Sequence, residues 1–275
     1  MPTEADPICI YDIGAQTEGA PRWNDLAHHE LVKMVEFEPE NPKTGQLPYY
    51  LGDGQEHVFH STRYFGCSSL LEPDPEVINL FTGIHCGSPG GNFTVMDRKT
   101  VSTTRLNDIP DLPVPDLVKI DTQGAELLIL EHAMNYVGQA LVVEVEVEFV
   151  KLYKSQPLFS EIDQFLRGHG FELHRLAEIA GRCFTPFQMT ASPFRGVSQF
   201  VFADAIYVRN LTTPQALKDQ ELVKLAKICH YCYGSYDLCA HLYAEYDRRH
   251  SSDWRNQYRQ SLSPVADRFL TARDH

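Results

Sequence analysis

Basic residues are scarce in this chain of 275 residues, which carries 24 lysines and arginines against 37 aspartates and glutamates. The formal net charge of -13 argues against sequence-independent binding of nucleic acid, because such affinity comes from clustered cations that release counterions from phosphates. Arg182, Arg195 and Arg209 are the nearest to a local basic group, and we interpret them as ordinary surface charge. No nucleic-acid partner is therefore expected.

Long apolar runs and an export signal are also missing. No stretch approaches the roughly 20 apolar residues that a membrane helix requires, and the first residues, MPTEADP, are acidic, unlike the basic flank of a signal peptide. The seven cysteines are odd in number and scattered, so reduced thiols are the default. We expect a soluble, cytoplasmic protein with no membrane span, built as one large α/β domain with a small appendage.

The most informative segment is LVKIDTQGAE at residues 117–126. An apolar run ends there in Asp121 and a glycine turn, just where a helical pattern begins. Ligands of open α/β sheets bind outside the carboxyl ends of the strands, so a strand of this kind delivers its terminal charge to the crevice. The alternative is that Asp121 only caps the helix that starts near Ala125.

Two earlier segments favour the ligand interpretation. The apolar strand ICIYDIGAQTEG at residues 8–19 contains an acid and a glycine turn, and LVKMVEFEP at residues 31–39 is a second strand that ends in an acid and a proline. Nucleoside ligands are held by a recurring arrangement. It consists of a strand, a glycine turn, a helix and, roughly 20 or more residues further on, an acid. Glu38 would accept hydrogen bonds from both ribose hydroxyls, and Gly14 and Gly19 would let the backbone approach the ligand.

These segments together resemble the FkbM family of S-adenosylmethionine-dependent methyltransferases. The family's motifs D-x-G-A, F-E-P and K-I-D-x-x-G-x-E stand here at residues 12–15, 37–39 and 119–126, and later landmarks extend the resemblance over roughly residues 8 to 209. The resemblance implies S-adenosylmethionine as cofactor and O-methylation, commonly of a sugar hydroxyl in a glycan, glycolipid or polyketide-derived product. The cofactor-binding residues that it implies are Asp12, Gly14, Ala15, Gln16, Gly19, Glu38, Pro39 and Asp121.

The chain departs from the family at its first turn. Gln16 stands where the family usually shows Asn, and the turn from Gly14 to Gly19 is one residue longer than usual, which leaves the contacts of Gln16, Thr17 and Glu18 open. Glu18 is an acid that would be unfavourable beside a pyrophosphate and tolerable beside the cationic sulfonium of S-adenosylmethionine. The turn therefore favours a sulfonium ligand over a dinucleotide.

The alternation of strand and helix patterns predicts an α/β protein with a mostly parallel sheet and helices on both faces, and the resemblance specifies a Rossmann-like class I methyltransferase. Seven strands are expected near residues 8–13, 31–38, 46–51, 116–121, 139–148, 171–177 and 199–208, with helices near 20–28, 74–82, 125–136 and 159–168. The expected domains are a methyltransferase domain at 1–210, with an insertion at 52–105 over the active site, and a C-terminal helical extension at 211–275.

One predicted strand is unusually acidic. Residues 141–148, LVVEVEVE, alternate apolar and acidic side chains, so that Glu144, Glu146 and Glu148 share one face. Three carboxylates on a buried face of a central strand would be costly. We therefore expect Glu146 and Glu148 in the crevice and treat Glu144 as structural or paired.

Methyl transfer from a sulfonium is an in-line displacement, so positioning supplies most of the acceleration, and a base helps when the acceptor is a hydroxyl. The candidate catalytic residues are Asp121, Glu146 and Glu148. The same carboxylates would alternatively hold a divalent cation that orients a vicinal diol, an interpretation that we favour less. Glu126 either points at the crevice or stabilises the N-terminus of its helix. Further candidates for a base, none of them favoured, are His57, His60 and His85.

The acceptor pocket is expected to combine aromatic faces for a sugar ring with polar groups for its hydroxyls. Two serines fall where the family often has a turn that resembles Gly-x-Ser-Ser-Leu, although serine in such a turn is often only a turn former. The candidate acceptor-binding residues are Ser68, Ser69, Tyr153, Gln156 and Phe159.

Residues 212–250 show helical spacing interrupted by Gly234 and Ser235, which predicts an αα-hairpin. Its cysteines and histidines invite a zinc interpretation, yet free cysteine is among the most buried residue types, and packing is the better explanation of Cys229, Cys232 and Cys239. We expect no metal in the protein. The hairpin is expected to pack beside the active-site mouth or to form a homodimer contact.

Two other classes of function remain open. A dinucleotide-dependent oxidoreductase would share the first strand, turn and acid, but it should show a tighter G-x-G-x-x-G and has no use for the second set of acids at residues 121–126. A protein that binds the cofactor without catalysis would keep the nucleoside pocket, and the intact Asp12, Glu38 and Asp121 argue against it.

Overall fold

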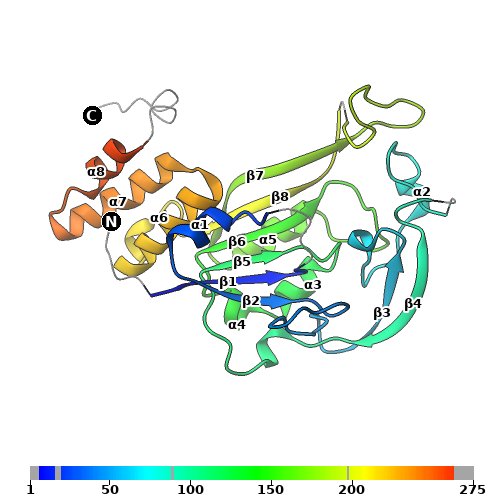
Figure 1. The fold of residues 1–275 in the computed structure, drawn as a ribbon, viewed down its shortest axis with the longest axis horizontal. Helices are drawn as coiled ribbons and strands as arrows, with labels where there is room; N and C mark the ends of the chain where they lie inside the picture. Colours follow the sequence, from blue (N-terminus) through cyan, green and yellow to red (C-terminus); the bar gives the residue numbers. More distant parts are fainter. Residues whose placement is uncertain (1–5, 16–19, 88–89, 197, 263–275) are drawn as a thin grey trace. The chain divides into compact units, whose positions relative to one another are not determined.

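The computed structural model describes residues 6–15, 20–87, 90–196 and 198–262 (Figure 1). The chain forms two compact units. The larger unit comprises Cys9–Gln16 and Met34–Arg209, and the smaller one comprises Met1–Ile8, Thr17–Lys33 and Asn210–His275. Each unit is described by itself below.

In the described residues the main sheet has six strands, in the order β2-β1-β5-β6-β8-β7. The strands are β1 (Ile8–Ile13), β2 (Val32–Phe37), β5 (Leu117–Ile120), β6 (Val142–Glu148), β7 (Phe171–Arg182) and β8 (Gln199–Arg209). β1, β5 and β6 are parallel, while β8 is antiparallel to both β6 and β7. The parallel strands therefore bring their carboxyl ends to one edge of the sheet, where ligands of α/β proteins bind.

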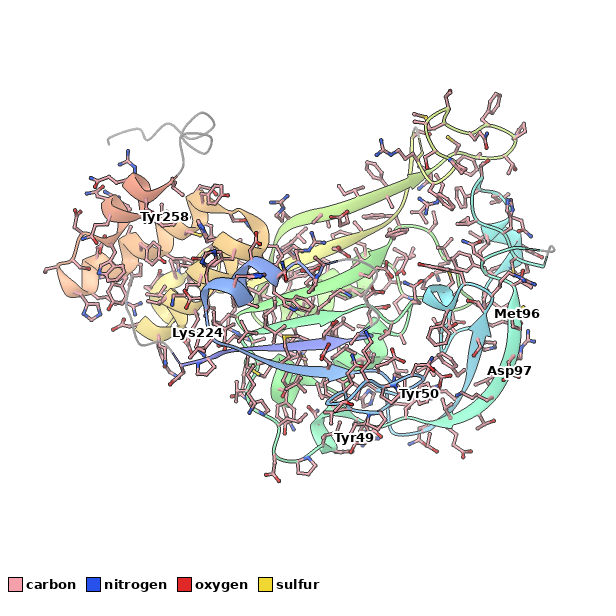
Figure 2. The ribbon with its side chains drawn as sticks, viewed as in Figure 1. Tyr49, Tyr50, Met96, Asp97, Lys224 and Tyr258 are labelled. Carbon is pink, nitrogen blue, oxygen red and sulfur yellow. The ribbon has the colours of Figure 1, made fainter. Side chains whose placement is uncertain are left out.

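Residues 46–51 do not form the seventh strand that the sequence predicts. Leu47 and Leu51 each make a single isolated bridge. Pro48 lies between them and has no N–H to donate to a ladder, and the side chain of Tyr49 is exposed (Figure 2). In the described residues the main sheet therefore has one strand fewer than the seven that the sequence predicts.

Alternate residues of the central strands form one hydrophobic core with three helices. Tyr11, Val118 and Val145 are fully buried in this core. The helices are α3 (Glu126–Glu131), α4 (Met134–Val137) and α5 (Phe159–Gly168), and α5 buries Ile162 and Leu166, which lie one turn apart. Each such side chain contributes about 1.5–3 kcal/mol relative to an exposed one. Helical cover of this face is as predicted, and a second helical layer stays a prediction.

The insertion between β2 and β5 contains a separate two-stranded antiparallel sheet. Its strands are β3 (Glu56–Thr62) and β4 (Val95–Ser102). A short turn of helix, η1 (Phe65–Cys67), and the helix α2 (Pro75–Ile78) lie between them in the sequence. The Asp74 side chain accepts a hydrogen bond from the N–H of Glu76, and Pro75 fits the first helical position, so α2 begins where capping rules place it.

β7 and β8 form a long antiparallel pair (Figure 1). The sequence predicts that the first of them ends at residue 177, whereas β7 continues to Arg182 because pairing with β8 persists as far as Gln199. The register of the pairing shifts at three places, where one of the two strands has an extra residue without a partner on the other, and the pairing resumes after each shift. Arg182 is therefore the last residue of β7 and not a loop residue.

The smaller unit holds the helices α1 (Asn24–His29), α6 (Asp219–Tyr233), α7 (Tyr236–His250) and α8 (Trp254–Ser261). α6 ends at Gly234, whose φ of 60° is left-handed and whose N–H bonds back to the helix, so the chain can turn sharply into α7. Cys229 and Cys239 are buried in these helices, and the Cys239 thiol donates to the carbonyl oxygen of Ala226.

The described residues contain no helix that is long and apolar enough to cross a membrane. They also contain no group of three or more His, Cys, Asp and Glu side chains placed to hold a metal ion.

Candidate functional site

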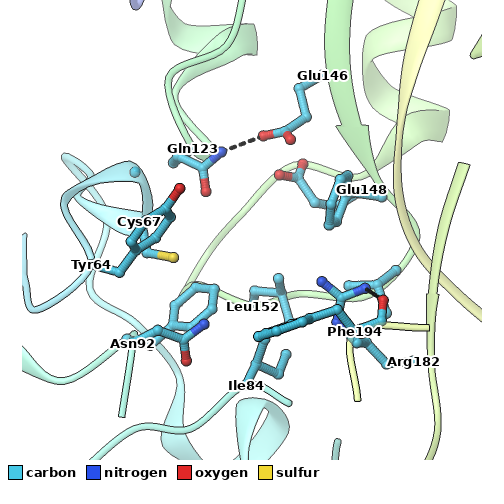
Figure 3. Close-up of a pocket in the computed structure, with 14 residues that line it drawn as sticks. Tyr64, Cys67, Ile84, Asn92, Gln123, Glu146, Glu148, Leu152, Arg182 and Phe194 are labelled. Carbon is cyan, nitrogen blue, oxygen red and sulfur yellow. Dashed lines mark hydrogen bonds between the residues drawn. The ribbon is translucent and has the colours of Figure 1, made fainter. Parts of the chain in front are cut away.

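A cavity of about 510 Å³ lies in the larger unit (Figure 3). It draws its walls from the insertion, from the turn after β5, from the end of β6 and from the β7–β8 pair. The lining residues are Tyr64, Gly66, Cys67, Ile84, Asn92, Phe93, Gln123, Glu146, Glu148, Leu152, Arg182, Phe194, Val201 and Phe202. The insertion thus contributes to the cavity wall, as a binding segment would.

Glu146 and Glu148 form the acidic part of the wall, at the carboxyl end of β6. Burial raises the pKa of both carboxyl groups well above the ordinary glutamate value, and neighbouring carboxylates raise it further. Glu148 is 2% exposed, and its Oε2 has no hydrogen-bond partner among the described residues. The period-two argument from the sequence therefore placed both residues in the cavity correctly.

A buried charged row crosses the strands behind this wall. Asp12, Lys119 and Glu144 are aligned in register on β1, β5 and β6. The Lys119 Nζ lies 3.2 Å from Asp121 Oδ2 and 4.0 Å from Asp12 Oδ1. Burial lowers the pKa of Lys119, but Asp121 and Asp12 outweigh this and raise it above its usual range. Glu144 also acts on Lys119, which supplies the cation of the row, and a purely structural role of Glu144 stays a prediction.

Asp12 and Asp121 respond differently to this row. Burial raises the pKa of Asp12 to about 6, against the opposing effect of Lys119. Burial also acts to raise the pKa of Asp121, but Lys119 and a hydrogen bond from Gln123 hold it below the ordinary value. Asp121 is therefore an ionised acid at neutral pH, while Asp12 binds a proton more readily.

Gln123 links the acids at the ends of β5 and β6. Its Nε2 donates to Asp121 Oδ1 at 3.1 Å and to Glu146 Oε2 at 2.6 Å (Figure 3). The hydroxyl of Tyr153 lies 3.2 Å from Gln123 Oε1 and donates to the carbonyl oxygen of Cys67 at 2.8 Å. The sequence analysis gave Gln123 no role, because it occupies a variable position of the motif, and the only signal was its place between two acids.

The cofactor candidates on β1 and β2 lie at the same edge of the sheet. Gly14 has a φ of 87°, and a Cβ there would lie 1.9 Å from the carbonyl oxygen of Asp121. The expected close approach therefore exists, but it is to the backbone of β5. Glu38 is buried, and its Oε1 accepts from the N–H groups of Glu40 and Asn41. Ala15 and Pro39 adjoin these two residues, whereas Gln16 and Gly19 lie outside the described residues.

Glu126 holds the turn that carries Gln123. Its carboxylate accepts from the N–H and hydroxyl of Thr122 and from the N–H of Gly124. Burial raises its pKa to about 7, although these backbone hydrogen bonds oppose the shift. Of the two interpretations offered by the sequence, stabilisation of the helix start is the one that these bonds support.

None of the five acceptor candidates is among the lining residues of this cavity. The Ser69 hydroxyl donates to the carbonyl oxygen of Gln123 at 2.7 Å, and the Ser68 hydroxyl accepts from the N–H of Thr62. Tyr153 and Gln156 are fully buried. Phe159 packs on Phe149, with ring centroids 5.8 Å apart. In this arrangement Ser69 and Tyr153 position Gln123, and direct contact of the five with an acceptor stays a prediction.

The three histidines of the insertion are not lining residues of this cavity. His57 bonds to Asp53 at 2.9 Å, and His85 is exposed. His60 is buried, its Nδ1 has no partner among the described residues, and burial lowers its pKa.

Arg182 is a functional candidate that the sequence analysis missed. It lines the cavity and is only 9% exposed, so its interpretation as ordinary surface charge is wrong. The error arose because β7 runs five residues beyond its predicted end. Arg195 is exposed, as predicted, whereas Arg209 is half-buried and donates to the carbonyl oxygens of Ala140 and Gly138.

Comparison with known proteins agrees with this architecture. The model of the methyltransferase FkbM domain matches residues 12–173, more than half of the chain. The chain belongs to the FkbM methyltransferase family. The match runs from Asp12 on β1 to the start of β7, and so includes the acidic ends of β5 and β6.

One curated relative of this FkbM chain is the hexuronic acid methyltransferase AglP of Haloferax volcanii. The two sequences are 31% identical over 155 residues, which cover 52% of this chain and 62% of the relative. This chain therefore spans less than two thirds of the relative's length. No solved structure matches.

Proposed function

We propose that this chain is an S-adenosylmethionine-dependent O-methyltransferase that methylates a hydroxyl group of a sugar in a glycan, glycolipid or natural product. The observation that carries the proposal is the acidic wall that Glu146 and Glu148 give the cavity, where the lining residue Gln123 joins Glu146 to Asp121. This wall lies at the carboxyl ends of parallel strands in a chain of the FkbM family.

The residues at the ends of β1 and β2 fit the cofactor. Glu38 Oε2 accepts no hydrogen bond from a described residue, and Asp12 Oδ1 is buried without a hydrogen-bond partner among them. Two carboxylates with open acceptors suit a ligand that carries hydroxyls and a positive charge. Glu38 would hold the ribose hydroxyls, and Asp12, Gly14 and Ala15 would border the ligand. S-adenosylmethionine supplies an electrophilic methyl group when bound.

Glu148 is the residue best suited to receive the proton of the acceptor hydroxyl. Its Oε2 has no hydrogen-bond partner among the described residues, whereas Glu146 Oε2 already accepts from Gln123. The raised pKa of Glu148 makes its ionised form a stronger proton acceptor than an ordinary glutamate. Asp121 and Glu146, fixed by Gln123, would orient the acceptor against the methyl group, and that alignment supplies most of the acceleration.

A divalent cation at the same acids is the alternative that the hydrogen bonds do not favour. Gln123 Nε2 donates to both Asp121 and Glu146, so one oxygen of each is occupied by an amide that a cation would have to displace. We therefore propose that the reaction proceeds without a metal ion.

A sugar acceptor is supported by the relative, whose name records a hexuronic acid as its substrate. The direct test is methyl transfer from S-adenosylmethionine to glycosides of hexoses and hexuronic acids, followed by mass spectrometry, with magnesium or with a chelator. Methylated glycoside formed equally in both conditions is the expected result. Cofactor binding without methylation of any acceptor would instead indicate a binding protein. Product formed only with magnesium would show that the reaction requires a metal ion.

A further inference from the structure

Arg182 is a buried cation without a carboxylate partner in the part of the chain that the structure describes. Its Nη1 donates to the carbonyl oxygens of Phe194 at 2.7 Å and Gly181 at 2.9 Å. Its Nε is buried and finds no hydrogen-bond acceptor among the described residues. The guanidinium lies 5.7 Å from the ring centre of Phe202 and 5.9 Å from that of Phe194. The described groups that stabilise its charge are thus neutral carbonyls, aromatic rings and the thiol of Cys67, and none of them is a carboxylate.

This environment is costly for the protein unless a ligand completes it. A buried charge is normally paired, and burial lowers the pKa of Arg182 despite an opposing effect from Cys67. Arginine stays protonated all the same, since its ordinary pKa is far above neutral. The cavity wall therefore holds a permanent positive charge for which the described residues supply no carboxylate.

The charges of the cavity are separated. Figure 3 shows Glu146 and Glu148 on one side of the cavity and Arg182 on another. A ligand that carries an anion at one end and a hydroxyl at the other would be held in one orientation, with its hydroxyl toward the acids. A neutral sugar would gain no such orientation.

We propose that Arg182 binds the carboxylate of the methyl acceptor, so that the acceptor is a uronic acid; this inference rests on the proposed function. A carboxylate carries one charge and has the planar shape that a guanidinium matches. A phosphate ester carries nearly two charges and would meet one arginine together with two glutamates, so it fits this cavity less well. Arg182 is thus a specificity residue, and the acids perform the reaction.

The test compares two probes that differ in one group, methyl glucuronide and methyl glucoside. Each is titrated calorimetrically into the protein saturated with S-adenosylhomocysteine, using the wild type, Arg182→Gln, Arg182→Lys and Arg195→Gln. Arg195→Gln removes the same charge from an exposed position of the same segment and is the matched control. Binding of S-adenosylhomocysteine to each variant shows whether it is folded.

The wild type is expected to bind the glucuronide about 10- to 100-fold more tightly than the glucoside, because a hydrogen bond to a charged group is worth that factor. Arg182→Gln should lose this preference, Arg182→Lys should keep part of it, and Arg195→Gln should keep all of it. The inference is overturned if the wild type binds the two probes alike, if it does not bind the glucuronide, or if Arg182→Gln retains the preference. Tighter binding of glucose 6-phosphate would overturn the assignment to a carboxylate.

Failure of this inference is distinct from failure of the proposed function. Equal methylation of glucoside and glucuronide would leave the methyltransferase proposal intact and remove the role of Arg182. A wild type that does not bind S-adenosylhomocysteine would overturn both.

Discussion

At the residue scale, the burial of Glu148 makes its ionised form unfavourable for folding and, by the same effect, a stronger proton acceptor. It lies beside Glu146 on a cavity wall, where burial and like charge favour the protonated form. Surface carboxylates of the chain have water to hydrate them and gain no such basicity. A strong proton acceptor is therefore obtained from an ordinary side chain by its surroundings alone.

Glu148→Gln should lower methyl transfer by roughly 100- to 10,000-fold, the usual contribution of a general base. The base must be ionised to accept a proton, and the pKa of Glu148 lies above the usual glutamate range. The wild-type rate should therefore fall as the pH is lowered through this raised pKa. The check is kcat/KM as a function of pH, with Glu131→Gln, an exposed acid of α3, as control. A wild-type profile that stays flat down to the ordinary glutamate pKa would contradict the role of Glu148.

The same acids should make the protein less stable as the pH rises. Asp12 has a pKa of about 6 and Glu126 of about 7, and those of Glu146 and Glu148 are raised, so the folded state binds more protons than the unfolded state above the ordinary values. Their contribution to stability is complete below the unfolded pKa and is lost as the pH passes the folded pKa. Unfolding temperature should therefore be higher near about pH 5 than near about pH 8.

Glu148→Gln offers a sharper form of this prediction. It should raise the unfolding temperature at alkaline pH by a few degrees, since each pKa unit removed is worth about 1.4 kcal/mol. At acidic pH, where Glu148 is already protonated, the change should be small. Calorimetric melting of wild type and variant at both pH values checks this, and equal shifts at the two would show that ionisation is not the cause.

At the element scale, the turn after β1 depends on Gly14. A Cβ at this position would collide with the carbonyl oxygen of Asp121, and the φ of 87° is itself unfavourable for other residues. Gly14→Ala should destabilise the protein by several kcal/mol, well beyond the roughly 1–3 kcal/mol of backbone strain alone. Gly45→Ala is the matched control, because Gly45 has a φ of 95° with nothing within 4 Å of the added Cβ. Equal losses of unfolding temperature in the two variants would contradict the collision.

The elements also show what the sequence can reveal. Periodicity two located Glu146 and Glu148 on the cavity wall, because alternation in a strand fixes the face of every side chain. The sequence pattern did not predict that the strand reaches Arg182, since the length of β7 depends on its pairing with β8. It also failed for residues 46–51, where Pro48 interrupts an otherwise strand-like composition. Contacts between distant segments, such as Ser69 with Gln123, leave no local pattern.

At the scale of the whole molecule, the C-terminal helices complete the smaller unit. α1 packs on α6, and Lys227, 4% exposed, donates to Glu30 at 2.6 Å. A chain ending at Arg209 would leave Glu30 and the apolar side of α1 without this partner. Both are joined in sequence to β1 and β2, which carry the cofactor candidates.

Truncation at Arg209 should therefore reduce solubility, assembly or affinity for S-adenosylmethionine. Assembly is measured because a homodimer contact is one of the expectations for residues 212–250. The control is a chain that ends at Leu262 and keeps all the described helices. Light scattering and calorimetric titration of both chains measure the three properties. A soluble truncated chain with unchanged mass and affinity would sink the proposal.

The central claim is that the described carboxylates hold an adenosyl cofactor, and one titration tests it most directly. S-adenosylmethionine and S-adenosylhomocysteine are titrated into the wild type, Glu38→Ala and the control Glu131→Ala, with NAD as a competing ligand class. The account predicts binding of both adenosyl ligands to the wild type and the control, a loss of roughly 10-fold or more in Glu38→Ala, and no binding of NAD. Failure of the wild type to bind either adenosyl ligand, or preference for NAD, would contradict it.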